Sequence, residues 1–276
     1  MKKPSAARRY ASQLKQKMPQ PADQPPKEHV LGSVRLFPGE TAIPMPDLRL
    51  RGTVGPPGAF DDVALTTIGR MNMAGLRPDH DVLDIGCGVG RTARYLCDYL
   101  GGEAHYEGFD ITEEGIVWCQ NNITPMFPNF QFRYVPLTNS HYTPDQVLPA
   151  AADFEFPYPD QSFDFVFAHS VFTHLLVDVT TRYLREIARV LRPGGISYST
   201  WFLFGEDSSP YANPIVGEMH PDPSGDFAFY NPEVPETAVG YRDTFVRQTL
   251  STCGLSVVEP IHPGYSRLQD VIVTTK

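Results

Sequence analysis

Residues 82–90 have the sequence VLDIGCGVG. The first four are mostly apolar and suit a short strand, and glycines follow at the alternate positions 86, 88 and 90. Val89 to Leu100 then places its apolar residues on one helical face. Glycine lets a ligand approach the backbone closely, and the first turn of a helix presents unpaired N–H groups. The stretch therefore predicts a strand, a ligand-binding loop and a helix in succession.

Predicted strands and helices alternate along the chain from Asp61 onward. Strands are predicted at 81–85, 104–110, 130–135, 162–169, 196–204, 255–258 and 268–275. Helices are predicted at 61–76, 89–100, 178–191 and 241–253, and a further helix opens at Thr112. Such alternation implies right-handed crossovers, so the predicted fold class is α/β with a doubly wound, mostly parallel sheet.

The first 60 residues differ in composition from the rest of the chain. They hold ten of the 27 prolines, and residues 1–22 contain six basic and no acidic side chains. We therefore divide the chain into a basic tail and proline-rich arm at 1–60 and a globular domain at 61–276. Residues 23–60 are expected to be draped over the mouth of the site. Residues 1–22 are interpreted as a solvated tail, with an organelle transit peptide as the alternative.

Composition and charge argue against several classes of protein. The net charge of −9 disfavours a nucleic-acid partner. No apolar run reaches the roughly 18 to 20 residues of a membrane span, and the N-terminus lacks the apolar region of a secretory signal. The four cysteines form no CxxC pair and no spacing that suits zinc. We expect a cytoplasmic protein with reduced thiols, no membrane partner and no metal; its oligomeric state is open, a homodimer included.

An acidic residue ends the strand that follows the glycine-rich loop. Asp110 lies some 20 residues beyond the glycines, where a carboxylate can accept hydrogen bonds from both hydroxyls of a ribose. The glycine spacing is GxGxG, and Arg91 stands where a dinucleotide-binding fingerprint has its third glycine. The loop therefore predicts a nucleoside-containing ligand and disfavours a nicotinamide dehydrogenase.

Four segments, in this order, resemble the class I, Rossmann-like S-adenosylmethionine-dependent methyltransferases. They are VLDIGCGVGR at 82–91, YEGFDIT at 106–112, FPYPDQSFDFVFAHSVFTHL at 156–175 and LREIARVLRPGGISYSTW at 184–201. Parts of these segments also resemble a bacterial subgroup associated with sugar and glycoconjugate pathways. The resemblance implies a three-layer fold, a seven-stranded sheet with the last strand antiparallel, and S-adenosyl-L-methionine as the cofactor.

The resemblance also implies which residues bind that cofactor. Asp110 would hold the ribose diol and Ile111 would pack on the adenine. Many family members place an acid after the third strand for the adenine amino group; here the backbone of Leu137 or the side chain of Asn139 is the candidate. The loop around the methionine and ribose parts would consist of Asp84, Gly86, Cys87, Gly88 and Gly90.

Two histidines follow the fourth predicted strand, where the family places its chemistry. His169 and His174 are the candidates for a general base, because imidazole titrates near neutrality. For either residue the alternative is a positioning role: His169 would hydrogen-bond in the cofactor pocket, and His174 would cap or pack under the next helix. The helix at 178–191 carries Arg182, Arg185 and Arg189 with Glu186, which is interpreted as a solvated face.

A proline-rich segment at 205–240 follows the fifth central strand. A loop of this length is usually functional, so it is interpreted as a substrate lid, with a surface excursion as the alternative. Its candidate acceptor contacts are Tyr211, His220 and Tyr230. Glu218, His220 and Asp222 alternate, and a solvated acidic loop is preferred over a metal site there.

These observations predict an enzyme that transfers a methyl group to a hydroxyl of a small molecule or glycoside by in-line displacement. Two alternatives remain open. One is a methyltransferase that acts on a macromolecule, RNA or protein, through the basic tail. The other is a cofactor-binding scaffold without catalysis.

Overall fold

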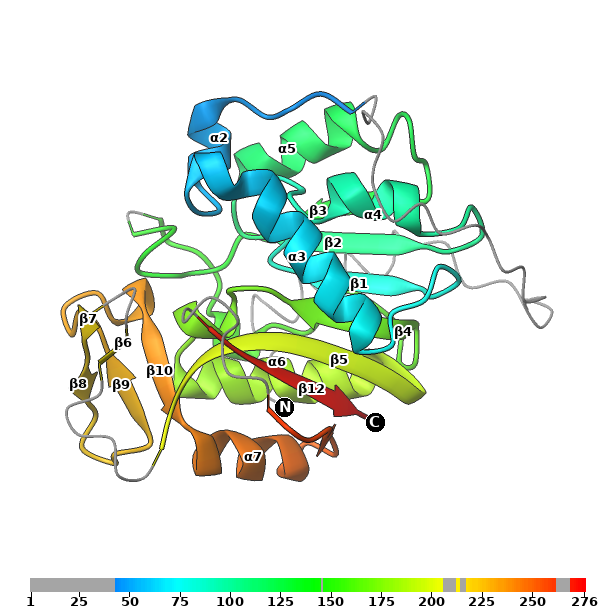
Figure 1. Ribbon diagram of the computed structural model, residues 1–276. Coiled ribbons are helices and arrows are strands. Elements are labelled where there is room, and N and C mark those ends of the chain that lie inside the picture. The colour runs from blue at the N-terminus through cyan, green and yellow to red at the C-terminus, as the bar shows by residue number, and fades with distance from the viewer. Residues whose placement is uncertain (1–42, 145, 206–211, 214–216, 262–268) are drawn as a thin grey trace, which may run out of the picture. The chain divides into compact units, whose positions relative to one another are not determined.

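The computed structural model describes residues 43–144, 146–205, 212–213, 217–261 and 269–276 (Figure 1). The chain divides into two compact units, which are treated separately below. Over the described residues, the N-terminal unit ends at Pro136 and the C-terminal unit begins at Leu137. The basic tail and most of the proline-rich arm, residues 1–42, lie outside the described residues.

The N-terminal unit contains three parallel strands in the order β1, β2, β3. They are β1 (Val82–Ile85), β2 (Tyr106–Asp110) and β3 (Phe130–Tyr134). Helix α4 (Ala93–Tyr99) connects β1 to β2, and α5 (Glu113–Asn122) connects β2 to β3. All four residues of β1 are buried, as expected for a parallel strand covered on both faces. Two successive βαβ crossovers confirm the predicted alternation in this part of the chain.

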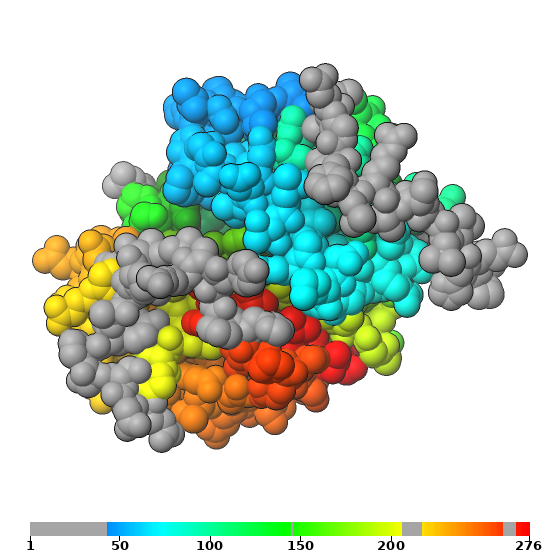
Figure 2. Space-filling view, in the orientation of Figure 1, coloured from blue at the N-terminus to red at the C-terminus, as the bar shows by residue number. Residues whose placement is uncertain are grey.

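The described end of the arm folds against the N-terminal unit. It forms α2 (Leu48–Gly52) and a 3₁₀ turn, η1 (Pro57–Ala59), and the long helix α3 (Phe60–Met73) of the domain follows. The Asp47 side chain caps α2 by accepting from the backbone N–H of Leu50 at 2.8 Å. Leu50, Phe60 and Val89 form one buried cluster. Figure 2 shows this segment, in blue, at the surface of the unit.

The C-terminal unit is built around a long strand, β5 (Leu191–Phe204). Strand β4 (Phe163–Ala168) pairs with β5 in parallel, and α6 (Val177–Val190) connects the two. The last strand, β12 (Asp270–Thr275), runs antiparallel to β5, as predicted. Its other neighbour is the short β11 (Ser256–Val257), which follows helix α7 (Asp243–Thr252). None of the helices in the described ranges combines the length and apolar character that a membrane crossing requires.

The predicted loop at 205–240 contains secondary structure in its described part. Strand β10 (Val239–Arg242) pairs in parallel with β5, and β9 (Phe227–Phe229) and β8 (His220–Pro221) extend the sheet antiparallel from it. A separate pair is formed by β6 (Ala212–Asn213) and β7 (Gly217–Glu218), and η4 (Pro235–Thr237) is a 3₁₀ turn. Phe204, Met219 and Ala228 form a small core of their own.

Two predicted boundaries are wrong. Tyr241 was expected to begin a helix, but it lies in β10, because its buried hydroxyl donates to the Leu175 carbonyl and its ring packs edge-on against Trp201. Strand β5 begins at Leu191 rather than 196, so residues 192–195, which separate the predicted helix at 178–191 from the predicted strand at 196–204, belong to the strand. Two features accommodate these residues in the strand. They are a register shift in the pairing with β4 between Phe163 and Phe165, and the left-handed conformation of Gly194 (φ +79°).

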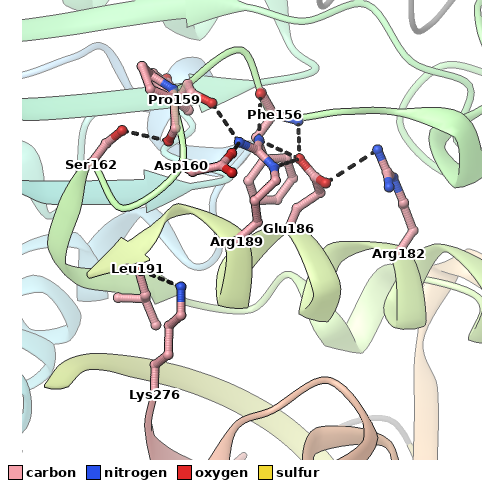
Figure 3. Close-up of polar contacts among 10 residues, drawn as sticks. Phe156, Pro159, Asp160, Ser162, Arg182, Glu186, Arg189, Leu191 and Lys276 are labelled. Atoms are coloured by element: carbon pink, nitrogen blue, oxygen red, sulfur yellow. Dashed lines mark hydrogen bonds and ion pairs between the residues drawn. The ribbon is translucent and has the colours of Figure 1, made fainter. Parts of the chain in front are cut away.

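Arg182, Arg189 and Glu186 of α6 do not form the expected solvated face (Figure 3). Arg185 is exposed, as expected. Glu186 is only 3% exposed, and its carboxylate accepts from Arg189 Nη2 at 2.6 Å and from the backbone N–H of Phe156 at 2.8 Å. Arg182 Nη2 lies 3.3 Å from the other carboxylate oxygen. Arg189 also donates to the backbone carbonyls of Phe156 and Tyr158. The network ties the segment before β4 to α6, because each buried charge needs a partner there.

Candidate functional site

The glycine-rich loop joins β1 to the segment before α4 with three left-handed residues. Gly86, Gly88 and Gly90 have φ values of +72°, +54° and +71°. Residues with a Cβ rarely adopt this region, so the alternate glycines are required by the path of the backbone. The N–H groups of Gly86 and Cys87 donate to the Phe109 carbonyl at 2.9 and 3.1 Å, which pins the loop to the end of β2.

Asp110 is organised by the same loop. One carboxylate oxygen accepts from the backbone N–H of Gly88 at 2.8 Å, and the other accepts from the N–H and hydroxyl of Thr112 at 2.7 and 2.5 Å. Burial raises the pKa of Asp110. An ionised carboxylate has about four lone-pair positions, so these bonds leave acceptor capacity for further donors.

The other side of the loop is closely packed by protein. A Cβ at position 88 would meet Val54 Cγ1 at 2.4 Å, and one at position 90 would meet Cys119 Sγ at 2.8 Å. Arg91 Nη1 donates to the Val54 carbonyl at 2.5 Å, which holds the arm at the loop. The sequence predicts that the arm lies over the site, but it does not identify Val54. The position of the arm before the domain was the only indication, because a side chain that packs on a glycine belongs to no recognisable sequence pattern.

Asp84 and Cys87 lie buried beside the glycines. The Tyr106 hydroxyl donates to the Asp84 carboxylate at 2.6 Å, and burial raises the pKa of Asp84 to about 8. Burial likewise raises the pKa of the Cys87 thiol, so this cysteine is not a nucleophile. The N-terminal unit therefore brings together, at the carboxyl ends of β1 and β2, the predicted residues Asp84, Gly86, Cys87, Gly88, Gly90, Asp110 and Ile111.

The remaining predicted site residues belong to the C-terminal unit. His169 directly follows β4 and is half-buried. The next residue, Ser170, has a left-handed φ of +58°, and its N–H is held by the Thr200 hydroxyl at 2.7 Å. Few residues other than glycine adopt this left-handed backbone conformation. At Ser170 it turns the chain sharply after the strand. The turn leads into the 3₁₀ turn η3 (Phe172–His174).

His174 lies in a cluster of three segments. Its ring stacks on His141, with centroids 5.7 Å apart and planes at 7°, and meets Tyr142 edge-on at 5.4 Å. Its Nδ1 lies 3.0 Å from the backbone carbonyl of Glu236, a residue of η4. Burial lowers the pKa of His174, the backbone of Glu236 opposes this shift, His141 lowers the pKa further, and the backbone of Thr237 raises it. The contacts of His141 and Glu236 with His174 were not predicted, because both residues lie far from His174 along the chain.

Asn139 organises the loop that carries His141. Its side-chain oxygen accepts from the N–H groups of His141 and Tyr142, both at 3.0 Å, and its Nδ2 donates to Glu236 at 3.1 Å. Both lone pairs of that oxygen are therefore used within the unit. Leu137 is buried, and its carbonyl accepts from Thr143. An adenine contact by either residue stays a prediction.

The predicted acceptor residues are dispersed. Tyr211 lies outside the described residues. His220 is exposed on β8, and Tyr230 is 45% exposed at the end of β9. Within the ranges that the structure describes, no group of three or more His, Cys, Asp and Glu side chains is placed so that it could hold a metal ion. Glu218, His220 and Asp222 do not form such a group.

Comparison with known proteins agrees with this arrangement. A family profile described as a methyltransferase domain matches residues 83–199, which include the glycine loop, Asp110 and both histidines. The match covers 117 of the 276 residues, so this part of the chain is similar to the methyltransferase family. A solved S-adenosylmethionine-dependent methyltransferase from Aquifex aeolicus is similar over 82% of this chain and 96% of its own, with a TM-score of 0.52 and 18% identity. This likeness confirms the predicted Rossmann-like fold of the methyltransferase domain.

Curated relatives of the methyltransferase domain differ in the atom they methylate. A sterol 24-C-methyltransferase of Yarrowia lipolytica is 33% identical over 128 residues, 44% of this chain and 27% of the relative. A fatty-acid O-methyltransferase of Mycolicibacterium smegmatis is 32% identical over 136 residues, covering 48% and 39%. The match thus spans less than half of the length of either relative.

The N-terminal unit fits the cofactor of this family, S-adenosylmethionine. Asp110 is a half-buried carboxylate that already accepts three hydrogen bonds, which leaves one of its four lone-pair positions, and desolvation is unfavourable for its charged form. A ribose hydroxyl can donate to that position. The methyltransferase domain would therefore hold the ribose at Asp110 and the rest of the cofactor along the loop from Asp84 to Gly90.

Proposed function

We propose that this protein transfers a methyl group from S-adenosylmethionine to a hydroxyl of a small molecule or glycoside. The observation that carries the proposal is the environment of His174. Its Nδ1 faces a carbonyl, which can only accept, and burial favours the neutral ring. A neutral imidazole that is protonated at Nδ1 has its lone pair at Nε2, and this is the form that removes a proton from an acceptor hydroxyl.

We assign one part of this chemistry to Asp110 with the glycine loop and another part to His174. S-adenosylmethionine, when bound, supplies a methyl group already activated by a sulfonium. Asp110 and the glycine loop bind and orient the nucleoside, with Asp110 held in place by Gly88 and Thr112. His174 accepts the hydroxyl proton at Nε2 while oxygen acquires the methyl group. Alignment accounts for much of the rate of such a displacement, and the base contributes a further factor of about 10² to 10⁴.

The test uses deuterated-methyl S-adenosylmethionine and mass spectrometry. The purified full chain is incubated with a library of hydroxylated small molecules and glycosides, together with matched amines and carboxylic acids. The expected result is a labelled methyl group on oxygen, lost in His174→Ala although S-adenosylhomocysteine still binds. Label found only on nitrogen or carbon, or transfer to oxygen that is unaffected in His174→Ala, would contradict the proposal. His105→Ala, at an exposed histidine that precedes β2, is the matched control.

A further inference from the structure

We propose that Glu236 is a positioning residue for His174: its backbone carbonyl selects the tautomer of the ring, and its carboxylate fixes the loop on which the ring is stacked. The inference rests on the proposed function, because it assigns a purpose to Nε2 of His174. It concerns only residues of the C-terminal unit. No site role follows from the sequence at position 236, which lies near the end of the proline-rich segment.

The first part of the argument is the contact between His174 and the Glu236 main chain. Nδ1 and the carbonyl oxygen are 3.0 Å apart. A carbonyl oxygen has no proton to donate, so Nδ1 must carry the hydrogen. In the neutral ring Nε2 then holds the lone pair. The contact thus excludes the tautomer in which Nε2 would be protonated and unable to act as a base.

The second part is the Glu236 side chain, which is only 8% exposed. One carboxylate oxygen accepts from Asn139 Nδ2 at 3.1 Å, and the other accepts from the backbone N–H of Ser140. Asn139 Nδ2 also donates to the backbone carbonyl of His174 at 3.2 Å. The carboxylate, the asparagine and the histidine are therefore connected in one closed network. A buried carboxylate bound in this way resists movement, because each displaced group would lose a partner.

The third part is what that network holds in place. Asn139 and Ser140 begin the loop whose next two residues, His141 and Tyr142, contact the His174 ring. Other titratable groups of the unit that lie against this histidine are the Glu236 carboxylate and Tyr241, whose hydroxyl binds the neighbouring Leu175 carbonyl. The ring is thereby constrained at Nδ1 by η4 and on its face by the loop. Only a ring with a fixed plane can present Nε2 in one direction.

Nitrogen NMR of histidine-labelled protein tests the inference without an acceptor. The spectra of wild type and Glu236→Ala are compared at a pH above the titration of histidine, with His174 assigned from its loss in His174→Gln. Wild type is expected to show a pure Nδ1–H pattern. In Glu236→Ala the two ring-nitrogen shifts should move toward each other as the second tautomer becomes populated. Glu236→Gln keeps an acceptor for Ser140 and should restore most of the wild-type pattern.

Two further variants control for loss of structure. Glu233→Ala removes an exposed carboxylate from the same segment and should leave the His174 pattern unchanged. Asn139→Ala breaks the network from its other end and should reproduce the effect of Glu236→Ala, which keeps the test valid if one variant folds poorly. An Nε2–H pattern in wild type, or an unchanged pattern in both Glu236→Ala and Asn139→Ala, would overturn the inference.

The kinetic consequence separates this inference from the proposed function. With an acceptor oxygen substrate in hand, Glu236→Ala should lower kcat by about tenfold to a hundredfold and leave KM for S-adenosylmethionine unchanged. Glu236→Gln should recover most of the loss. If the protein methylates nitrogen or carbon, the proposed function fails while the tautomer result stands. If oxygen is methylated but Glu236→Ala retains full kcat, the positioning inference alone fails.

Discussion

The backbone N–H of Gly88 donates a hydrogen bond of 2.8 Å to the Asp110 carboxylate. The bond connects the glycine-rich loop after β1 to the last residue of β2. The strands β1 and β2 pair in parallel. Thr112 binds the second carboxylate oxygen, so the side chain has a defined orientation. A nucleoside that binds here meets a carboxylate that needs no reorganisation, which favours affinity.

Replacing Asp110 should therefore weaken cofactor binding strongly. Asp110→Ala removes a charge-assisted hydrogen bond to the ribose, worth about 1.5–3 kcal/mol, so the Kd for S-adenosylhomocysteine should rise by at least about tenfold. Isothermal titration calorimetry measures it. Glu113→Ala, an exposed carboxylate in the first turn of α5, is the control and should bind like wild type. Equal affinity in Asp110→Ala and wild type would contradict the assigned ribose site.

The contact between Gly88 and Val54 predicts a stability effect with two separable causes. Gly88→Ala places a Cβ 2.4 Å from Val54 Cγ1 and forces alanine to a φ of +54°. We expect a loss of about 2–5 kcal/mol in the free energy of unfolding, from overpacking and backbone strain together. Denaturant unfolding should show that Val54→Ala recovers the overpacking part in a double-mutant cycle.

A glycine with the same backbone region but open surroundings separates the strain from the clash. Gly194 has a φ of +79°, and no described heavy atom lies within 4 Å of its added Cβ. Gly194→Ala should lose only the strain part, about 1–2 kcal/mol. Two results would contradict the prediction: an equal loss of unfolding free energy in Gly194→Ala and Gly88→Ala, or additive losses for the Val54 and Gly88 substitutions. Either would show that contact with Val54 does not contribute to the cost of Gly88→Ala.

Because Asp84 is buried, we expect its contribution to the free energy of unfolding to decline as pH rises. Its pKa is raised by burial to about 8 in the folded protein, against 3.8 for an ordinary aspartate. The stability from its protonated form is thus complete below about pH 4, and is lost as pH rises through about 8. Asp84→Asn removes this dependence and should stabilise the protein at pH 8 by a few kcal/mol.

Unfolding curves at pH 5, 6, 7 and 8 measure this difference. The gain of Asp84→Asn over wild type should grow steadily across the series, because an amide accepts from the Tyr106 hydroxyl without carrying a charge. Asp98→Asn, at an exposed position of α4, should show a gain near zero at each pH. A constant gain, or a gain that shrinks as pH rises, would reverse the assigned sign.

The Glu186 network predicts a large effect from one α6 substitution and a small effect from a neighbour. Glu186→Ala leaves the partly buried Arg189 and Arg182 without their shared carboxylate, and should reduce the free energy of unfolding by about 3–5 kcal/mol. Asp160 pairs with the same Arg189 but its side chain is 73% exposed, so Asp160→Ala should lose less than about 1 kcal/mol. Comparable losses in the two variants would show that burial does not govern this network.

The predicted elements that held are those with a strong local signal. The alternate glycines, the apolar strand before them and Asp110 at the end of the next strand predict the nucleoside site, and the structure brings these residues together. Their geometry depends on chain neighbours and on one parallel strand pair, so pattern is sufficient. The antiparallel last strand followed from the family resemblance and is confirmed.

The elements that failed are those whose conformation depends on distant partners. Tyr241 lies in a helix-like pattern, yet its hydroxyl binds Leu175 and Thr180 and its residue joins β10. Glu186 alternates with arginines as a solvated helix face does, but the Phe156 segment covers it. Local periodicity describes which side of a helix is polar and contains no information about what covers that side.

The sequence by itself determined the fold class, the glycine-rich loop and the carboxylate that serves it, because backbone conformation and strand order follow from nearby residues. The tertiary structure decided the environment of His174. Glu236 lies 62 residues from His174 along the chain and Asn139 lies 35 residues away, and hydrogen bonds at these separations leave no periodic trace. Which nitrogen of that histidine carries the proton is thus a property of the folded C-terminal unit.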